Sequence, residues 1–207
     1  TRRLSSAASD VYKRQNVRDA TRDYDTYSSD APFRVPIPSE EDLRRVRQLP
    51  IEVNPPEHTE YRKIAEPFFK LPNTSEFKKT IADMIERMIR EACETGEVEV
   101  VREFSLPMQS LALTHLLKMP ESEAELWTSW GTHVFRDGED GEARGMTLEK
   151  YIHAQFDRAE ADPGEDFFSV LGEATYQDRP LTRDEKVGFA NLTFAGGVYL
   201  TSITGNT

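Results

Sequence analysis

His58 and Arg62 are the side chains whose types and spacing most clearly suggest chemistry. They follow Asn54-Pro55-Pro56-Glu57, a run typical of a helix start, with Asn54 as N-cap, Pro55 in the first turn and Glu57 at a capping-box position. Residues four apart project from the same face of a helix. The pattern therefore predicts a helix that directs a His and an Arg at one anionic group. A solvated helix with an ordinary His/Arg pair is the alternative.

The composition is that of an acidic, polar, globular chain. It has 207 residues, a formal net charge of -11, 37% hydrophobic residues and 30% charged residues, which suits one domain with one core. The net charge argues against general binding to nucleic acid or to an anionic membrane. No apolar run is long enough to cross a bilayer and no signal peptide is evident, so a soluble, cytoplasmic protein is expected.

Cys93 is the only cysteine of the sequence, so an intrachain disulfide is excluded and a reducing compartment is compatible. It follows Ala92 in a strongly helical stretch. We expect a small, half-buried hydrophobic role there rather than a reactive or metal-ligating thiol.

The first fifteen residues differ in character from the rest. Their second part matches the translation of a common transposase sequencing adapter, so residues 1–15 are expected to be a non-native tail; a disordered basic tail is the alternative. Residues 16–50 contain few aliphatic side chains. A short helix over residues 17–24 and then a proline-rich loop are expected there.

From Pro55 onward the hydrophobic periodicity predicts a mainly α fold. The helix over residues 75–95 has the clearest amphipathic stripe and ends at Gly96, and Thr182 with Glu185 has the spacing of a capping box. The elements expected are helices over residues 55–70, 75–95, 106–119, 121–136, 147–161, 166–174 and 182–203, a short half-buried strand over residues 97–101, and an acidic loop over residues 137–141.

Gly196 and Gly197 lie in the interior of the last expected helix, where each glycine costs about 1 kcal/mol relative to alanine. Such a pair permits either a kink or the close approach of another group. Tight packing against another helix is the alternative.

Three segments, in one order, resemble bacterial soluble cytochromes P450 of the camphor-hydroxylase-like class. Residues 55–62, which read Pro-Pro-Glu-His-Thr-Glu-Tyr-Arg, resemble the start of the family's helix C. Residues 100–120 resemble its strand and helix E, and residues 179–197 the start and centre of helix I. The resemblance covers about residues 16–207. It implies an incomplete cytochrome P450 fold, about helices B to I with a short strand, truncated at both ends.

The resemblance implies a haem-thiolate monooxygenase that hydroxylates a small organic substrate, using O2 and two electrons from a ferredoxin-type redox partner. The cofactor implied is haem b, with its propionates on His58 and Arg62. The small residues implied over the distal haem face are Ala195, Gly196 and Gly197. The residues expected to contact the substrate are Val198, Trp127 and Trp130.

Two features depart from the family pattern. Tyr199 and Leu200 stand where the family has the acid and the threonine of its proton relay, and Thr201 is one residue late. The relay is therefore altered, replaced by a water chain, or misrepresented by an unreliable sequence end.

The ligand cysteine of the family would follow residue 207, and Cys93 cannot replace it. The chain alone is therefore expected to be inactive. The alternatives are an acidic, non-catalytic α-helical interaction module and a degenerate P450-like protein that binds haem or another ligand without turnover.

Overall fold

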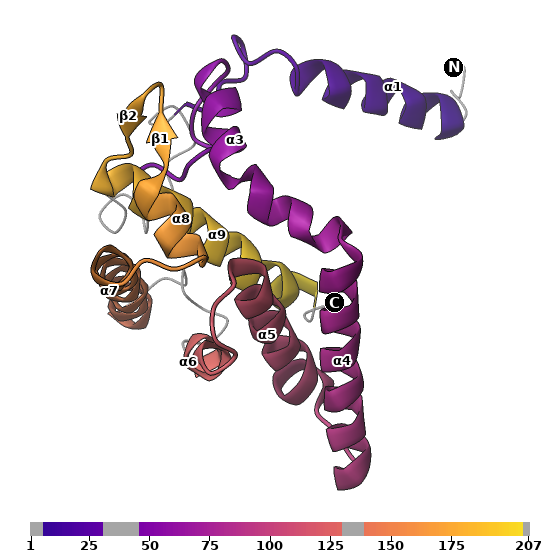
Figure 1. The fold of residues 1–207 in the computed structure, drawn as a ribbon. Helices are drawn as coiled ribbons and strands as arrows, with labels where there is room; N and C mark the ends of the chain where they lie inside the picture. Colours follow the sequence, from indigo (N-terminus) through magenta and orange to yellow (C-terminus); the bar gives the residue numbers. More distant parts are fainter. Residues whose placement is uncertain (1–5, 31–45, 130–138, 205–207) are drawn as a thin grey trace.

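The computed structural model describes residues 6–30, 46–129 and 139–204, with side chains described for residues 13–30, 46–129, 146–194 and 196 (Figure 1). The chain is mainly helical there, as predicted. No helix in this part is long and apolar enough to cross a membrane. The helices are α1 (Ser6–Ala20), α3 (Glu57–Lys70), α4 (Ser75–Thr95), α5 (Leu106–Leu117), α6 (Glu123–Ser129), α7 (Glu139–Ala161), α8 (Phe167–Glu173) and α9 (Arg183–Thr204).

Helices α3 and α4 form a bent arm along one side of the molecule, joined by the short 3-10 turn Leu71–Asn73 (Figure 1). Thr74 caps α4, because its hydroxyl accepts a hydrogen bond from the Phe77 N–H at 3.2 Å. Gly96 ends α4 in the left-handed region with φ 77°, which glycine adopts without steric cost. Both limits of this helix agree with the sequence prediction.

Residues 97–101 do not form the predicted strand. Residues 97–99 are irregular, and Val100–Ser105 forms a π-helical turn whose first N–H groups are accepted by the Glu99 carboxylate. A strand needs a neighbour, and the one sheet in the described residues is the two-stranded antiparallel pair β1 (Thr175–Tyr176) and β2 (Arg179–Pro180). The local turn supported by Glu99 therefore forms instead, and Val98, Val100 and Val101 remain exposed.

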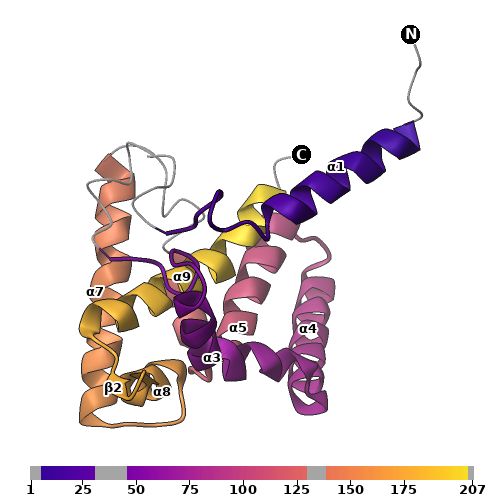
Figure 2. The ribbon, with the colours of Figure 1, turned by 90° about the horizontal axis from the view of Figure 1, so that it is seen from above.

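Two other predicted limits differ from the structure. Residues 139–141, expected in a loop, are the first residues of α7, where acidic side chains favour a helix N-terminus; residues 137–138 lie outside the described part. Helix α1 runs from Ser6 to Ala20, so it includes much of the expected tail and ends before Tyr24. It projects away from the other helices (Figure 2).

The core lies where α9 crosses between α7 and α5 (Figure 2). Phe168 of α8 is fully buried there, with edge-to-face ring contacts to Phe156 at 5.1 Å and Phe167 at 5.7 Å. Trp127 of α6 packs edge-to-face on Phe194 of α9 at 5.0 Å. Large aromatic side chains from four helices thus fix the position of α9.

The segment that leads into α3 passes close to α9 at Gly188. A Cβ atom at residue 188 would overlap the carbonyl oxygen of Arg47 and lie 3.2 Å from its carbonyl carbon. Leu49 and Val53 of this segment are buried in the same core. The glycine therefore lets residues 46–53 lie directly on α9. These residues lead to the start of α3.

Candidate functional site

The start of α3 is held by Asn54, although not in the predicted way. Helix α3 begins at Glu57 without a side-chain cap, so the expected roles of Asn54 as N-cap and Glu57 in a capping box are wrong. Instead, the Asn54 side chain accepts from the Ser29 N–H at 3.0 Å and donates to the Ser28 hydroxyl at 2.7 Å. Its carbonyl accepts the His58 N–H at 3.0 Å. Asn54 therefore ties the loop around Ser28 to the first turn of the helix.

His58 and Arg62 lie on the first two turns of α3, as predicted, with His58 half-buried and Arg62 exposed. Within the described part of the chain, neither side chain makes a hydrogen bond or an ion pair with another residue. His58 and Arg62 thus present hydrogen-bond donors that no acidic side chain among the described residues occupies.

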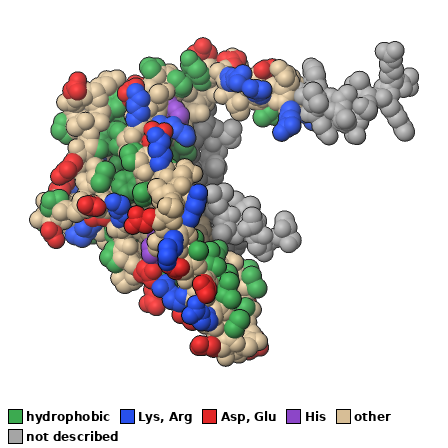
Figure 3. All heavy atoms as spheres, turned by 45° about the vertical axis from the view of Figure 1, so that its right-hand side comes forward, with side chains coloured by type: hydrophobic (Ala, Val, Ile, Leu, Met, Phe, Trp, Pro, Cys, Tyr) green, Lys and Arg blue, Asp and Glu red, His purple; other side chains and the backbone are tan. Residues whose placement is uncertain are grey.

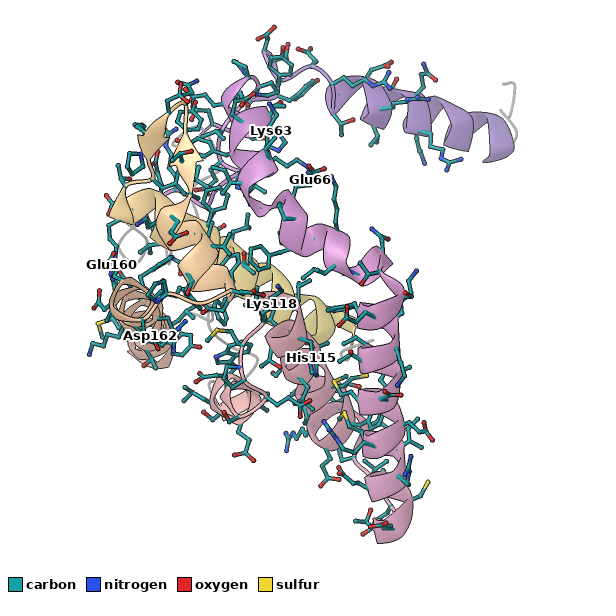
Figure 4. The ribbon with its side chains drawn as sticks, in the orientation of Figure 1. Lys63, Glu66, His115, Lys118, Glu160 and Asp162 are labelled. Carbon is teal, nitrogen blue, oxygen red and sulfur yellow. The ribbon has the colours of Figure 1, made fainter. Side chains whose placement is uncertain are left out.

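Two acidic side chains farther along α3 are already paired within the helix. Glu60 pairs with Lys63 at 2.7 Å and Glu66 with Lys70 at 3.2 Å. Figure 4 shows that Lys63 and Glu66 project from the side of α3 away from β1. These exposed pairs satisfy the lysines and leave His58 and Arg62 available to an external anion.

His58 lines a groove of about 620 Å³ beside the start of α3. The wall is formed by the end of α1, the loop that follows it and the segment before α3. It combines two tyrosine rings with polar side chains, so a ligand with an apolar body and a polar group would find contacts for both parts. The lining residues are Val17, Ala20, Thr21, Tyr24, Tyr27, Ser29, Ile51, Val53, Asn54, Pro55 and His58.

Helix α3 is fixed to α9 through Tyr61 and Glu185. The Tyr61 hydroxyl donates to Glu185 Oε1 at 2.5 Å, and Arg179 donates to both Glu185 oxygens at 2.6 and 2.8 Å. The predicted capping box is confirmed, because Glu185 Oε2 accepts the Thr182 N–H at 2.7 Å and the Thr182 hydroxyl accepts the Glu185 N–H at 3.2 Å. The sequence indicated the capping box but not the Tyr61 or Arg179 contacts.

These contacts change the titration of both partners. The hydrogen bonds from Arg179, opposed by partial burial and aided by those from Tyr61 and Thr182, lower the pKa of Glu185 to about 2. Burial, together with the hydrogen bond to Glu185, raises the pKa of Tyr61. At neutral pH the pair is therefore a carboxylate and a neutral phenol, the combination that gives a strong charge-assisted hydrogen bond.

Gly196 of α9 is exposed, and, apart from its own helix backbone, no atom of the described residues lies within 4 Å of the place that a Cβ would take. The alternative of tight helix packing is therefore not what the structure shows at this glycine. The other expected site residues of α9 lie in the helix, but their side chains are outside the described part. They are Ala195, Gly197, Val198, Tyr199, Leu200 and Thr201.

Of the two tryptophans expected to contact the substrate, the structure describes only Trp127. Trp127 is fully buried in the aromatic core and presents no accessible surface. It is a packing residue between α6 and α9 in this structure. Trp130 lies outside the described residues.

Cys93 lies near the end of α4 opposite to α3 and is exposed, so the expected half-buried role is wrong. It lines a largely apolar groove of about 590 Å³ with Ile89, Val98, Val100 and Phe104. Figure 3 shows hydrophobic side chains gathered over this end of the molecule. Among the described residues, no cluster of three or more His, Cys, Asp or Glu side chains could hold a metal ion.

Several known proteins are similar to the chain over most of its length, although no protein-family model matches it. Cytochrome P450-SOY of Streptomyces griseus is 27% identical over 167 residues, which are 78% of this chain and 40% of that protein. Erythromycin C-12 hydroxylase of Saccharopolyspora erythraea is 28% identical over 212 residues, which are 95% of this chain and 50% of that protein. The solved structure of a carbohydrate active P450 is 46% identical and superposes with a TM-score of 0.75 over 82% of this chain and 44% of that one.

The chain has the fold of part of a cytochrome P450. It spans about half of the length of these P450 relatives, or less. The resemblance found in the sequence is therefore confirmed by relatives and by fold.

The P450 fold implies haem, and the described residues fit one part of it. His58 and Arg62 have the donor chemistry that carboxylates need and have no anion of their own among the described residues. Gly196 leaves open space beside α9. The described residues do not supply an axial thiolate beside this helix, because Cys93 lies near the far end of α4.

Proposed function

We propose that the protein containing this chain is a haem-thiolate monooxygenase. Its relatives include a steroid C26-monooxygenase of Rhodococcus jostii and a linalool 8-monooxygenase of Pseudomonas putida. The observation that carries the proposal is the pair His58 and Arg62, two hydrogen-bond donors on one helical face, in a P450-like fold, without a protein anion in the described part.

In this proposal His58 and Arg62 bind the two haem propionates. Arg62 offers parallel N–H donors that match the two oxygens of a carboxylate, and His58 adds one further donor on the same face. Haem b, when bound, supplies the activation of O2 and the insertion of one oxygen atom. A ferredoxin-type protein would supply the two electrons.

The α9 segment would line the distal side of the cofactor. The absence of side-chain bulk at Ala195, Gly196 and Gly197 would leave space for O2 and substrate, with Val198 next to them. Leu200 neither donates nor accepts a hydrogen bond, so protons would reach the site through water, Tyr199 or Thr201 rather than through residue 200.

For the substrate, we propose a carbohydrate or a sugar derivative. The relative that is 46% identical is described as a carbohydrate active P450, whereas the Streptomyces and Saccharopolyspora relatives are 27% and 28% identical. Adding monosaccharides to the ferric protein should displace the sixth haem ligand and shift the main (Soret) absorption band of the haem. A shift with linalool but with no sugar would refute the substrate class while leaving the enzyme class intact.

The enzyme class is tested with the protein encoded by the complete reading frame that contains this sequence. After reduction and addition of carbon monoxide, the absorption band of a haem-thiolate is expected, and its absence would refute the monooxygenase assignment. The variant His58→Ala/Arg62→Ala should release haem to apomyoglobin at least tenfold faster, because each lost charge-assisted hydrogen bond contributes about 1.5–3 kcal/mol.

Arg90→Ala is the matched control for this variant. Arg90 is an exposed arginine of α4 that pairs with Glu86 in the same helix at 3.0 Å. Its replacement should leave haem release unchanged. Equal release rates for the double variant and the wild type would show that the propionates bind elsewhere.

A further inference from the structure

Tyr61 stands between His58 and Arg62 in the sequence, but its side chain points into the protein. It is 7% exposed, stacks on Tyr176 of β1 with ring centroids 4.2 Å apart and an interplanar angle of 11°, and meets Phe189 of α9 edge-on at 6.0 Å. Its hydroxyl reaches Glu185 at the start of α9. One side chain therefore connects the cation-bearing turns of α3 to two other elements.

Glu185 offers Tyr61 an acceptor that is fixed in place. Arg179 binds both of its oxygens, and the Thr182 N–H binds Oε2. The Arg179 guanidinium also lies over the Tyr176 ring at 5.1 Å from its centroid. Because the carboxylate is held from the β2 side and from the helix cap, the Tyr61 hydroxyl has one favourable position.

The hydrogen bond from Tyr61 adds to the packing of Ala65 and Phe68 in fixing the rotation of α3 about its axis. Among the described residues, the bond from Tyr61 to Glu185 is the one side-chain hydrogen bond between α3 and α9. Successive residues of a helix are 100° apart, so fixing the direction of Tyr61 also fixes the directions of the preceding turn and of the next residue. Those positions are His58 and Arg62.

We propose that Tyr61 and Glu185 are positioning residues that aim His58 and Arg62 at a pair of carboxylates. The proposal rests on the proposed function, in which those carboxylates belong to haem. Without the Tyr61 hydroxyl, ring packing still holds α3 on α9, but the helix rotates more freely and the donors of His58 and Arg62 meet the carboxylates less often. The loss therefore falls on carboxylate recognition rather than on the apolar contacts of the cofactor.

The test compares two probes that differ only in their carboxylates. Ferric haem and its dimethyl ester are titrated into the cofactor-free protein of the complete reading frame and followed by absorbance. Wild-type protein should prefer haem over the ester. Tyr61→Phe should reduce this preference about threefold to tenfold, in the range of one ordinary hydrogen bond, with little change in the affinity for the ester.

Tyr176→Phe is the matched control. Tyr176 is a neighbouring buried tyrosine in the same stack, and its hydroxyl has no hydrogen-bond partner among the described residues. Its replacement should leave the preference for haem unchanged. Far-UV circular dichroism verifies that both variants are folded, and Glu185→Gln, which keeps an acceptor for Tyr61 but weakens it, should give a smaller loss of the same kind.

The outcomes separate this proposal from the proposed function. Equal loss of affinity for haem and ester in Tyr61→Phe would mean general loosening and would overturn the positioning role, as would an unchanged preference. In the Arg62→Ala background, Tyr61→Phe should have little further effect. If wild-type protein does not distinguish haem from its ester, the propionate assignment itself fails, whatever Tyr61 does.

Discussion

The two described glycines of α9 that lie in its interior, Gly188 and Gly196, should respond in opposite directions to alanine. At Gly188 a Cβ would overlap the Arg47 carbonyl oxygen and approach the Leu49 nitrogen to 3.6 Å. At Gly196 the same atom would have no neighbour within 4 Å among the described residues outside its own helix backbone. Both residues are helical and belong to one helix, so each variant is the control for the other.

The magnitudes follow from two competing effects. Replacing a helix-interior glycine by alanine stabilises a helix by about 0.5–1 kcal/mol, because alanine loses less backbone entropy on folding. At Gly188 this gain is opposed by an overlap with backbone, which is relieved only by moving residues 46–49 or α9; overpacking of this kind costs about 1–3 kcal/mol or more. We expect Gly188→Ala to destabilise the protein by about 1–2 kcal/mol and Gly196→Ala to stabilise it by about 0.5 kcal/mol.

Urea unfolding followed by circular dichroism measures both changes. The midpoint should fall for Gly188→Ala and rise for Gly196→Ala, with similar slopes. Hydrogen exchange should report faster opening of residues 46–53 in the first variant only. If Gly188→Ala were as stable as the wild type with unchanged exchange, the close contact between Arg47 and α9 would be refuted.

Three further predictions concern the cap of α8, the aromatic core and the Glu185 carboxylate of α9. Asp166→Ala should lower the free energy of unfolding by about 2–3 kcal/mol, because Asp166 caps α8 and accepts a 2.8 Å hydrogen bond from Arg158; Asp166→Asn should cost less, as urea unfolding would show. Phe168→Ala should cost about 3–5 kcal/mol and Phe69→Ala, at an exposed site, less than about 0.5 kcal/mol; similar values in the same assay would contradict the described core. Because the pKa of Glu185 is lowered from 4.5 to about 2, its contribution to the free energy of unfolding is complete above pH 4.5 and is lost as the pH falls towards 2. In Glu185→Gln, the free energy of unfolding measured by urea at a series of pH values should therefore change less over this range.

The elements that the sequence predicted well are those with local signals. Thr74 and Gly96 limit α4, and Thr182 with Glu185 starts α9, because caps and left-handed glycines act within one helical turn. The shared face of His58 and Arg62 was predictable for the same reason. Helical spacing alone determines it.

The features that the sequence did not reveal depend on distant residues. Residues 97–101 alternate as a strand does, but pairing requires a second strand that the described residues do not supply. Asn54 was expected to cap α3, yet its side chain binds Ser28 and Ser29, 26 and 25 residues away. That Arg62 has no anionic partner among the described residues also became visible only with the other elements in place.

The hydrogen bond between Tyr61 and Glu185 joins residues 124 positions apart, and this separation has a consequence for biosynthesis. Closing so long a loop is entropically costly and slow compared with forming α3 itself. At about 5–20 residues per second, a ribosome needs about 6–25 seconds after Tyr61 to reach Glu185. During that time α3 exists without its partner, so the orientation of His58 and Arg62 is fixed only after Glu185 has been synthesised.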